Sequence, residues 1–290
     1  MGRTNAGIFM LNEMKNKLPP SERKIAQYIL EYPEKAINMT ATELGRESET
    51  SSAAVIRLCK SLNLKGFQEL KLRVAGDLQR NEVLEFRDIE PNEPITSTIE
   101  KVTLNSVQTI QETANLLDTD NLNEALEALL KGRRIYFFGV GASSIPAIDA
   151  YQKFLRINRA TSALTDLHMA ATAVANASDE DVVFGISFSG ETHEVAKILE
   201  IANARGAKTI SLTKYGRSTV SDQADINLYT SATKEATFRS GATSSRIAQL
   251  HVIDILFMCL ASRSYEQTVD YLDSTRVAIN NLNEKVKKKK

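Results

Sequence analysis

From about residue 134 onward, the chain alternates short apolar segments of strand length with amphipathic segments of helical length. Alternation of this kind with short connections predicts a parallel sheet with helices on both faces, which is an α/β fold. The expected strands are residues 134–139, 161–165, 181–187, 208–213 and 225–229. The expected helices between them are residues 144–156, 168–177 and 193–205.

The first 80 residues have a different character, because they contain short helical patterns and no strand pattern. One helix begins near Ser21 and is stopped by Pro33. A second covers residues 41–47, with Thr40 and Glu43 spaced as a capping box. After a three-residue turn, a third helix follows Ser51. Two short helices joined by a tight turn form the outline of a helix-turn-helix, so we predict an all-α N-terminal domain.

Residues 81–100 have the composition of a linker, with six acidic residues, one basic residue and two prolines. We therefore expect a helix-turn-helix domain over residues 1–80, an acidic linker over 81–100, and an α/β domain with helical flanks over 101–290. A length of 290 residues suits two domains.

Charge and composition exclude several classes of protein. The chain carries 36 basic and 36 acidic residues, but residues 1–80 hold 13 basic and nine acidic ones. Such local positive charge is what contact with a phosphate backbone requires. The 42% of hydrophobic residues excludes a disordered chain, and no apolar run approaches 18 residues, so we expect no membrane span. The N-terminus lacks the pattern of a secretory signal, which predicts a cytoplasmic protein.

No metal or cofactor site is predicted. Cys59 and Cys259 are too far apart in sequence for a metal or redox motif, and both lie in apolar helical patterns, so we expect buried free thiols. A dinucleotide fingerprint beginning at Gly139 and Gly141 should end in glycine or alanine, but Ser144 occupies that position.

The third short helix has two distinct faces. At about 100° per residue, Val55, Leu58, Cys59 and Leu62 share the face expected to enter the core. Small residues at the start of the helix and cations further along occupy the other face, as in a recognition helix. The predicted DNA contacts are Ser51, Ser52, Ala53, Arg57, Lys60 and Lys65. The alternative is a helical adaptor whose polar face is merely solvated.

Two strand-to-helix connections are rich in hydroxyl groups. The first, after residue 139, carries Ser143 and Ser144 at a helix N-terminus, where backbone amides favour an anion. The second has Ser187, Ser189 and Thr192 around a glycine. No lysine follows, so this is not a nucleotide triphosphate loop, and hydroxyls with amides suit a phosphate monoester. Ordinary turns are the alternative, but two such loops favour a shared phosphate pocket.

Both regions resemble known families. The run SSAAVIRLCKSLNLKGFQELKLRV resembles the helix-turn-helix of RpiR-type regulators, and the likeness spans about residues 5–80. Within that pattern, Gly45 stands where alanine is usual, and Glu49 occupies a turn where glycine or a small polar residue is common. The GVGAS turn, the SFSGET loop and the segment ISLTKYGRSTVSDQADINLY resemble the SIS (sugar isomerase) domain over about residues 120–260. The whole chain looks closest to the MurR-like branch of the RpiR family, whose members sense N-acetylmuramic acid 6-phosphate.

The resemblance implies specific site residues. Ser143, Ser187, Ser189 and Thr192 take the phosphate-contact positions, with the backbone amide of Phe188 beside them. The segment EATFRSGATSSRIAQL resembles the loop and helix that close the site in RpiR-type regulators. It implies that Glu235, Arg239 and Arg246 contact sugar hydroxyls, a carboxylate or a neighbouring subunit.

These patterns together predict a dimeric or tetrameric DNA-binding regulator, which represses an amino-sugar catabolic operon and responds to an amino-sugar 6-phosphate. The alternative is a sugar-phosphate isomerase or etherase with an accessory helical domain. A phosphosugar-binding protein without a DNA role is a third possibility. Isomerisation needs a base beside the sugar carbonyl, and the spacing of the three histidines (His168, His193 and His251) and of Glu191 and Glu235 defines no acid–base pair. We therefore predict that the chain is not an enzyme.

Overall fold

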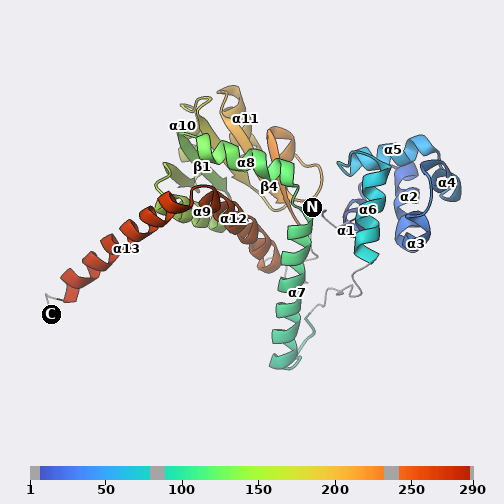
Figure 1. The fold of residues 1–290 in the computed structure, drawn as a ribbon, viewed down its shortest axis with the longest axis horizontal. Helices are drawn as coiled ribbons and strands as arrows, with labels where there is room; N and C mark the ends of the chain where they lie inside the picture. The colour runs from blue at the N-terminus through green and yellow to red at the C-terminus, as the bar shows by residue number, and fades with distance from the viewer. Residues whose placement is uncertain (1–6, 79–88, 232–241, 288–290) are drawn as a thin grey trace. The chain divides into compact units, whose positions relative to one another are not determined.

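A computed structural model describes residues 7–78, 89–231 and 242–287 (Figure 1). The chain forms two compact units. One comprises Met1–Leu117 with two short later segments, Lys214–Gly216 and Tyr229–Ser245. The other comprises Asp118–Thr213, Arg217–Leu228 and Arg246–Lys290.

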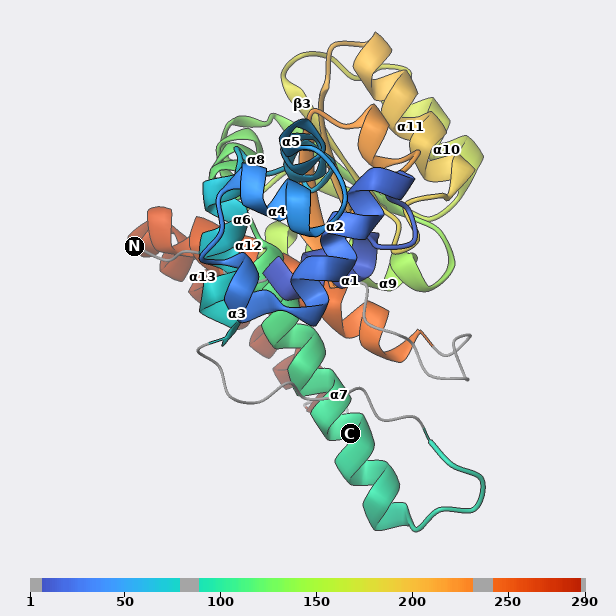
Figure 2. The same ribbon diagram turned by 90° about the vertical axis from the view of Figure 1, so that its right-hand side faces the viewer.

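The N-terminal residues form short helices only, as predicted (Figure 2). In chain order they are α1 (Gly7–Met14), α2 (Pro20–Glu31), α3 (Pro33–Ala36), α4 (Ala41–Glu47), α5 (Ser52–Ser61) and α6 (Phe67–Leu78). Each short helix is stabilised mainly by burying one face, because isolated helices of this length are marginal in water. The shared core includes Leu11, Ile25, Ile29, Leu44, Leu58, Leu62 and Leu70, all fully buried.

The helix starts expected from the sequence are confirmed by their caps. Thr40 accepts a hydrogen bond from the Glu43 amide at 3.2 Å, and the Glu43 carboxylate accepts one from the Thr40 amide at 2.7 Å. These contacts lower the pKa of Glu43. Ser51 caps α5 by accepting from the Ala54 amide at 3.2 Å. The chain therefore bends between α4 and α5 where the sequence predicts.

Helix α7 (Ile95–Leu116) begins inside the stretch with linker composition. Pro94 directly precedes it, and proline is well tolerated at a helix start because the first amides have no helical partner. Helix α8 (Thr119–Lys131) follows and is capped by Asp118, which accepts from two backbone amides.

Five strands form one parallel sheet in the order β2-β1-β3-β4-β5. They are β1 (Arg134–Gly139), β2 (Thr161–Leu164), β3 (Asp181–Ile186), β4 (Lys208–Lys214) and β5 (Ile226–Thr230). Each strand end lies within one residue of its predicted position. The helices α9 (Ser144–Arg156), α10 (Leu167–Val174) and α11 (His193–Ala204) connect them. Helix α10 ends before the predicted residue 177, because the chain there forms a turn in which the Ala177 amide bonds to the Val174 carbonyl.

Alternate side chains of β1 enter opposite faces of the sheet, as the pleat requires. Tyr136 and Phe138 belong to a buried cluster with residues of α10 and α11, which lie side by side in both views (Figures 1 and 2). Phe137 instead contacts Phe154 of α9, with ring centroids 5.4 Å apart. Helices therefore cover both faces, which confirms the predicted layers.

Two long helices complete the chain, α12 (Thr243–Arg263) and α13 (Tyr265–Lys287). The prediction of no membrane span rested on uninterrupted apolar runs, whereas α12 meets a test of length and mean hydropathy. The core helix of a soluble protein can have the same length and mean hydropathy. Ala248, Val252 and Leu256 of α12 are fully buried, as in a core helix.

The two cysteines have different environments. Cys59 is buried, and burial raises the pKa of its thiol to about 11. Cys259 is only partly buried, so the expectation that both thiols are buried is wrong for this residue. The adjacent residue Met258 is 63% exposed, so the side of α12 that carries Met258 is not covered by the rest of the described chain.

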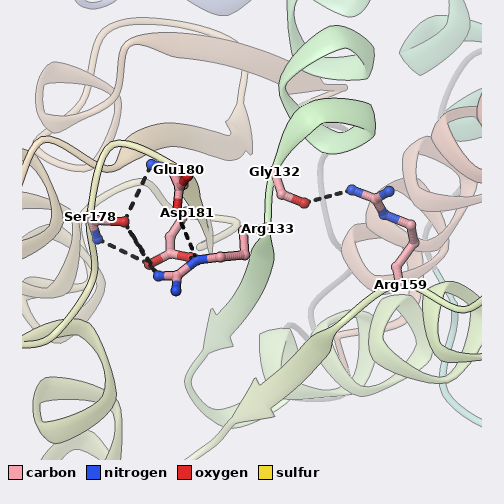
Figure 3. Close-up of polar contacts among 6 residues, drawn as sticks. All are labelled: Gly132, Arg133, Arg159, Ser178, Glu180 and Asp181. Atoms are coloured by element: carbon pink, nitrogen blue, oxygen red, sulfur yellow. Dashed lines mark hydrogen bonds and ion pairs between the residues drawn. The ribbon is translucent and has the colours of Figure 1, made fainter.

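The amino ends of β1 and β3 are tied together by a buried carboxylate (Figure 3). Asp181 has no exposed surface and accepts hydrogen bonds from the Ser178 amide and from Arg133, both at 3.0 Å. Beside this cluster, Arg159 donates to the Gly132 carbonyl at 2.6 Å, at the end of α8. These contacts stabilise the amino edge of the sheet.

Candidate functional site

Helix α5 presents a polar face to solvent. All six predicted DNA-contact residues, Ser51, Ser52, Ala53, Arg57, Lys60 and Lys65, are exposed. On the opposite side the four residues expected in the core, Val55, Leu58, Cys59 and Leu62, are buried. The helix therefore has the two faces that a recognition helix needs.

Sequence reasoning missed Ile56, which lies on the exposed face of α5 and is 42% exposed. An exposed aliphatic side chain beside Ser52 and Lys60 can contact a thymine methyl group. Helical spacing could have identified this residue, because Ile56 lies four positions after Ser52 and four before Lys60 and so shares their face of the helix.

The turn before α5 contains Glu49, whose backbone φ is 52°. This left-handed conformation favours glycine or asparagine, which agrees with the small residue expected there. The Glu49 carboxylate pairs with Lys24 at 3.0 Å, and both side chains are exposed. Its charge is therefore partly balanced within the domain.

The two serine loops follow neighbouring strands. β1 and β3 pair in parallel, and their last residues, Gly139 and Ile186, are register partners. The loops that start there consequently emerge side by side at the carboxyl edge of the sheet. In open parallel sheets this edge is where ligands bind.

The first loop is compact and needs glycine. A side chain at Gly139 would place its Cβ 2.4 Å from the Ser143 carbonyl oxygen. Ser143 is buried, and its hydroxyl accepts a hydrogen bond from the Gln249 amide at 3.2 Å. The Ser144 hydroxyl donates to the Gly141 carbonyl at 2.7 Å.

The second loop is ordered by its own hydroxyl groups. Ser187 is buried, and its hydroxyl lies 2.7 Å from that of Thr192. The same hydroxyl accepts from the Gly190 amide at 3.2 Å. Gly190 has a φ of 74°, and a Cβ there would lie 2.4 Å from the Ser218 hydroxyl, so glycine is required. Phe188 and Ser189 are half-buried at the tip.

The helices after the two loops lack the side-chain caps seen elsewhere in the sheet unit. Asp118 caps α8 and Asp166 caps α10. At the starts of α9 and α11, by contrast, the N-cap residues Ser143 and Thr192 make no side-chain hydrogen bond to the helix amides. The Thr192 hydroxyl, which could cap α11, is bonded to Ser187 instead. Free N-terminal amides together with the helix dipole favour a bound anion at the start of α11. At the start of α9 the dipole acts but few amides are free, because the Ser144 amide donates to carbonyls of the preceding 3-10 turn, Gly141–Ser143, and Pro146 has no amide hydrogen.

Some predicted residues are not brought together. Glu235 and Arg239 lie outside the described residues. Arg246 is half-buried on α12, and His193 is exposed at the start of α11. Within residues 7–78, 89–231 and 242–287, no group of three or more His, Cys, Asp or Glu residues could hold a metal ion.

Sequence reasoning also missed the residues that support the two loops. Gln249 reaches Ser143 from α12, 106 positions away in sequence. Ser218 packs against Gly190, and Thr219 donates to the Glu191 carboxylate. Ser218 and Thr219 lie in the segment after β4 that resembles the SIS domain, but nothing local indicates which loop they support.

The fold and these two sites define a class of protein: a helix-turn-helix domain joined to a SIS-type α/β domain with two hydroxyl-rich loops at the carboxyl edge of its sheet. Comparison with known proteins supports this class. Residues 7–81 match the helix-turn-helix domain of the rpiR family, and residues 128–259 match the SIS domain. The chain belongs to the RpiR family of helix-turn-helix transcriptional regulators.

Similar proteins cover nearly the whole chain. The HTH-type transcriptional regulator YbbH of Bacillus subtilis is 50% identical, with 95% of this chain and 98% of that protein aligned. The regulator TTE0211 of Caldanaerobacter subterraneus is 43% identical over 92% of this chain and 95% of its own length. Among solved structures, the Vibrio vulnificus NanR protein complexed with ManNAc-6P has a TM-score of 0.60 and 27% identity, covering 95% of this chain and 98% of that one.

Proposed function

We propose that this protein represses an amino-sugar catabolic operon and is released from its operator by a phosphosugar bound at the two serine loops. The observation that carries the proposal is the pairing of Gly139 with Ile186, which brings two hydroxyl-rich loops and two uncapped helix starts to one edge of the sheet. The buried Ser187 hydroxyl and the first amides of α11, together with the helix dipoles of α9 and α11, suit the binding of one phosphate group.

The DNA half of the proposal rests on α5. Its exposed cations supply the electrostatic part of binding, and small residues at its start allow close approach to base edges. We expect Arg57→Ala to weaken operator binding by about 1–3 kcal/mol if the guanidinium contacts a base. An unchanged affinity at fixed salt would exclude that role.

For the effector we propose N-acetylmuramic acid 6-phosphate, because the sequence resembles the MurR-like branch. NanR, a 27% identical structure, is complexed with ManNAc-6P, so an N-acetylated amino-sugar 6-phosphate is the shared chemistry. The muramic compound differs from ManNAc-6P in its configuration at C2 and in a lactyl ether that carries a carboxylate. We propose that the cations Arg239 and Arg246 contact this carboxylate. Glu235 and the same arginines are proposed to contact sugar hydroxyls.

We further propose that the protein acts in the cytoplasm as a homodimer or homotetramer. A palindromic operator presents two half-sites, so a symmetric oligomer with two recognition helices matches it. Measurement of molar mass by light scattering, with and without effector, tests the oligomeric state.

Thermal-shift and calorimetric titrations of the full chain test the effector. The ligands are N-acetylmuramic acid 6-phosphate, ManNAc-6P and unphosphorylated N-acetylmuramic acid. A ligand at 100 times its Kd stabilises the folded state by about 2.7 kcal/mol, so the phosphorylated sugars should raise the Tm and the unphosphorylated sugar should not.

Ser187→Ala should abolish the effect of the phosphosugar on DNA affinity while binding of the free protein to DNA is retained. Ser178→Ala is the matched control, because Ser178 lies at the opposite edge of the same sheet. Release of DNA from the Ser187 variant at the wild-type ligand concentration would show that the phosphate site is wrong. Turnover of the sugar phosphates would instead favour an isomerase or etherase.

A further inference from the structure

Glu22, in the first turn of α2, is a buried carboxylate with only 4% of its surface exposed. A buried charge is costly unless it is paired and hydrogen-bonded. The N-terminal position on α2 is favourable for a negative charge but does not by itself balance it. The partners of Glu22 therefore indicate why a carboxylate is held here.

Two residues of α5 contact the Glu22 carboxylate. The Ser61 hydroxyl donates to Glu22 Oε2 at 2.7 Å, and Arg57 Nε lies 3.8 Å from Oε1. Arg57 and Ser61 are four positions apart, so they lie on the same side of α5 in consecutive turns. One carboxylate thus contacts the recognition helix at two points, a hydrogen bond that fixes its own position and an ion pair with Arg57.

In this arrangement the Nη groups of Arg57 are not used by Glu22 and can contact another group. The Arg57 side chain is 56% exposed, whereas that of Glu22 is 5% exposed. The Nε edge of the guanidinium faces Glu22, and the two Nη groups are the remaining donors. An ion pair at 3.8 Å does not fix the plane of the guanidinium, but it favours side-chain conformations in which the Nη groups point away from Glu22. Those conformations suit the bidentate contact with O6 and N7 of guanine.

We infer that Glu22 is a positioning residue for DNA recognition: it orients Arg57 toward a base edge and does not contact DNA itself. This inference rests on the proposed function, because it requires α5 to bind DNA. It adds a determinant of specificity that lies on a different helix from every predicted DNA contact. The carboxylate acts through the direction of the guanidinium, so its removal should alter base preference more than general attraction to DNA.

Glu22→Gln tests this inference, because the amide oxygen can still accept from Ser61 while the charge that attracts Arg57 is removed. The full chain is first used to select binding duplexes from a pool with a randomised central segment. Affinity is then measured at fixed salt on the selected duplex and on a mixed-sequence duplex. We expect Glu22→Gln to weaken binding to the selected duplex by about tenfold and to leave binding to the mixed-sequence duplex unchanged or tighter, because a negative charge is lost.

A double-mutant cycle with Arg57→Lys identifies the route of the effect. Lysine keeps the positive charge but lacks the planar fork. Both single variants should relax preference at the same base pair, and the double variant should bind the selected duplex no more weakly than Arg57→Lys alone. Glu31→Gln, at the far end of α2, is the charge-matched control and should leave both affinities unchanged.

Four outcomes would overturn the inference. Equal losses on the two duplexes, or an undiminished effect of Glu22→Gln in the Arg57→Lys background, would show a general structural role. Unchanged base preference in Arg57→Lys would show that Arg57 does not contact a base, while the regulator proposal would stand. Failure of the wild-type chain to select any duplex would remove the proposed function itself, and the inference with it.

Discussion

At the scale of single residues, Glu49 shows how two unfavourable features can be tolerated at a turn. Its backbone is left-handed, which costs a non-glycine residue roughly 1–2 kcal/mol. Its carboxylate also lies beside the helix proposed to approach DNA phosphates. The ion pair with Lys24 offsets little of the backbone strain or of the repulsion from phosphates, because an exposed ion pair contributes about 0–1 kcal/mol.

Glu49→Gly is therefore expected to stabilise the N-terminal domain by about 1 kcal/mol and to tighten binding to mixed-sequence DNA. Glu49→Gln is the matched control, because it removes the charge but keeps the strained backbone. The glutamine variant should reproduce the gain in DNA affinity without the gain in Tm. A lower Tm for the glycine variant would contradict the strain argument.

At the scale of elements, Gly45 lets α4 approach the start of α5. A Cβ at this position would lie 2.8 Å from backbone atoms of both Ser51 and Ser52. The departure from alanine noted in the sequence therefore has a local reason in this chain. Glycine inside a helix costs about 1 kcal/mol in helix propensity, but here it permits a close contact between two backbones that a Cβ would prevent.

Gly45→Ala should lower the free energy of unfolding, because a clash with backbone costs about 1–3 kcal/mol and exceeds the gain in helix propensity. Gly66→Ala is the control, since a Cβ there meets no atom within 4 Å. Its unfolding free energy should stay within about 1 kcal/mol of the wild type. Denaturant unfolding of both variants measures the difference, and a more stable Gly45→Ala protein would contradict the packing argument.

Helix α12 supplies a pH-dependent contribution through His251. Burial lowers the pKa of this imidazole, and the nearby Asp254 opposes the shift. Folding therefore disfavours the protonated form, so the contribution of His251 to stability is lost as pH falls through its unfolded pKa of about 6.5. The Tm of the wild type should fall more between pH 7.5 and pH 5.5 than that of His251→Gln. Identical pH profiles would contradict this prediction.

At the scale of the whole molecule, an effector that releases DNA must obey thermodynamic linkage. The factor by which the phosphosugar weakens operator binding must equal the factor by which operator DNA weakens phosphosugar binding. Coupling of this kind is typically about 1–3 kcal/mol, or roughly 5–150-fold. The two affinities are measured by calorimetry with and without the second ligand. Unequal factors would show that ligand and DNA binding are not linked in a single equilibrium.

Much of the structure could be predicted because it depends on neighbouring residues. The pattern of α5, repeating at helical spacing, placed Val55 and Leu58 in the core and Arg57 outside it. Thr40 with Glu43, and Ser51 with Ala54, cap helices through contacts three positions apart. Strand ends were predicted to within one residue, since each strand is a short apolar run ended by polar or glycine residues.

The sequence by itself therefore determined the elements, the exposed face of α5 and the hydroxyl content of two loops, because local periodicity and caps are encoded within a few positions. Only the tertiary structure decided which groups meet. Strand order places Gly139 beside Ile186, and packing brings Gln249 to Ser143 and Ser61 to Glu22. Those pairs are separated by tens of residues, so their contacts depend on how helices and strands pack together, and no local pattern specifies that packing.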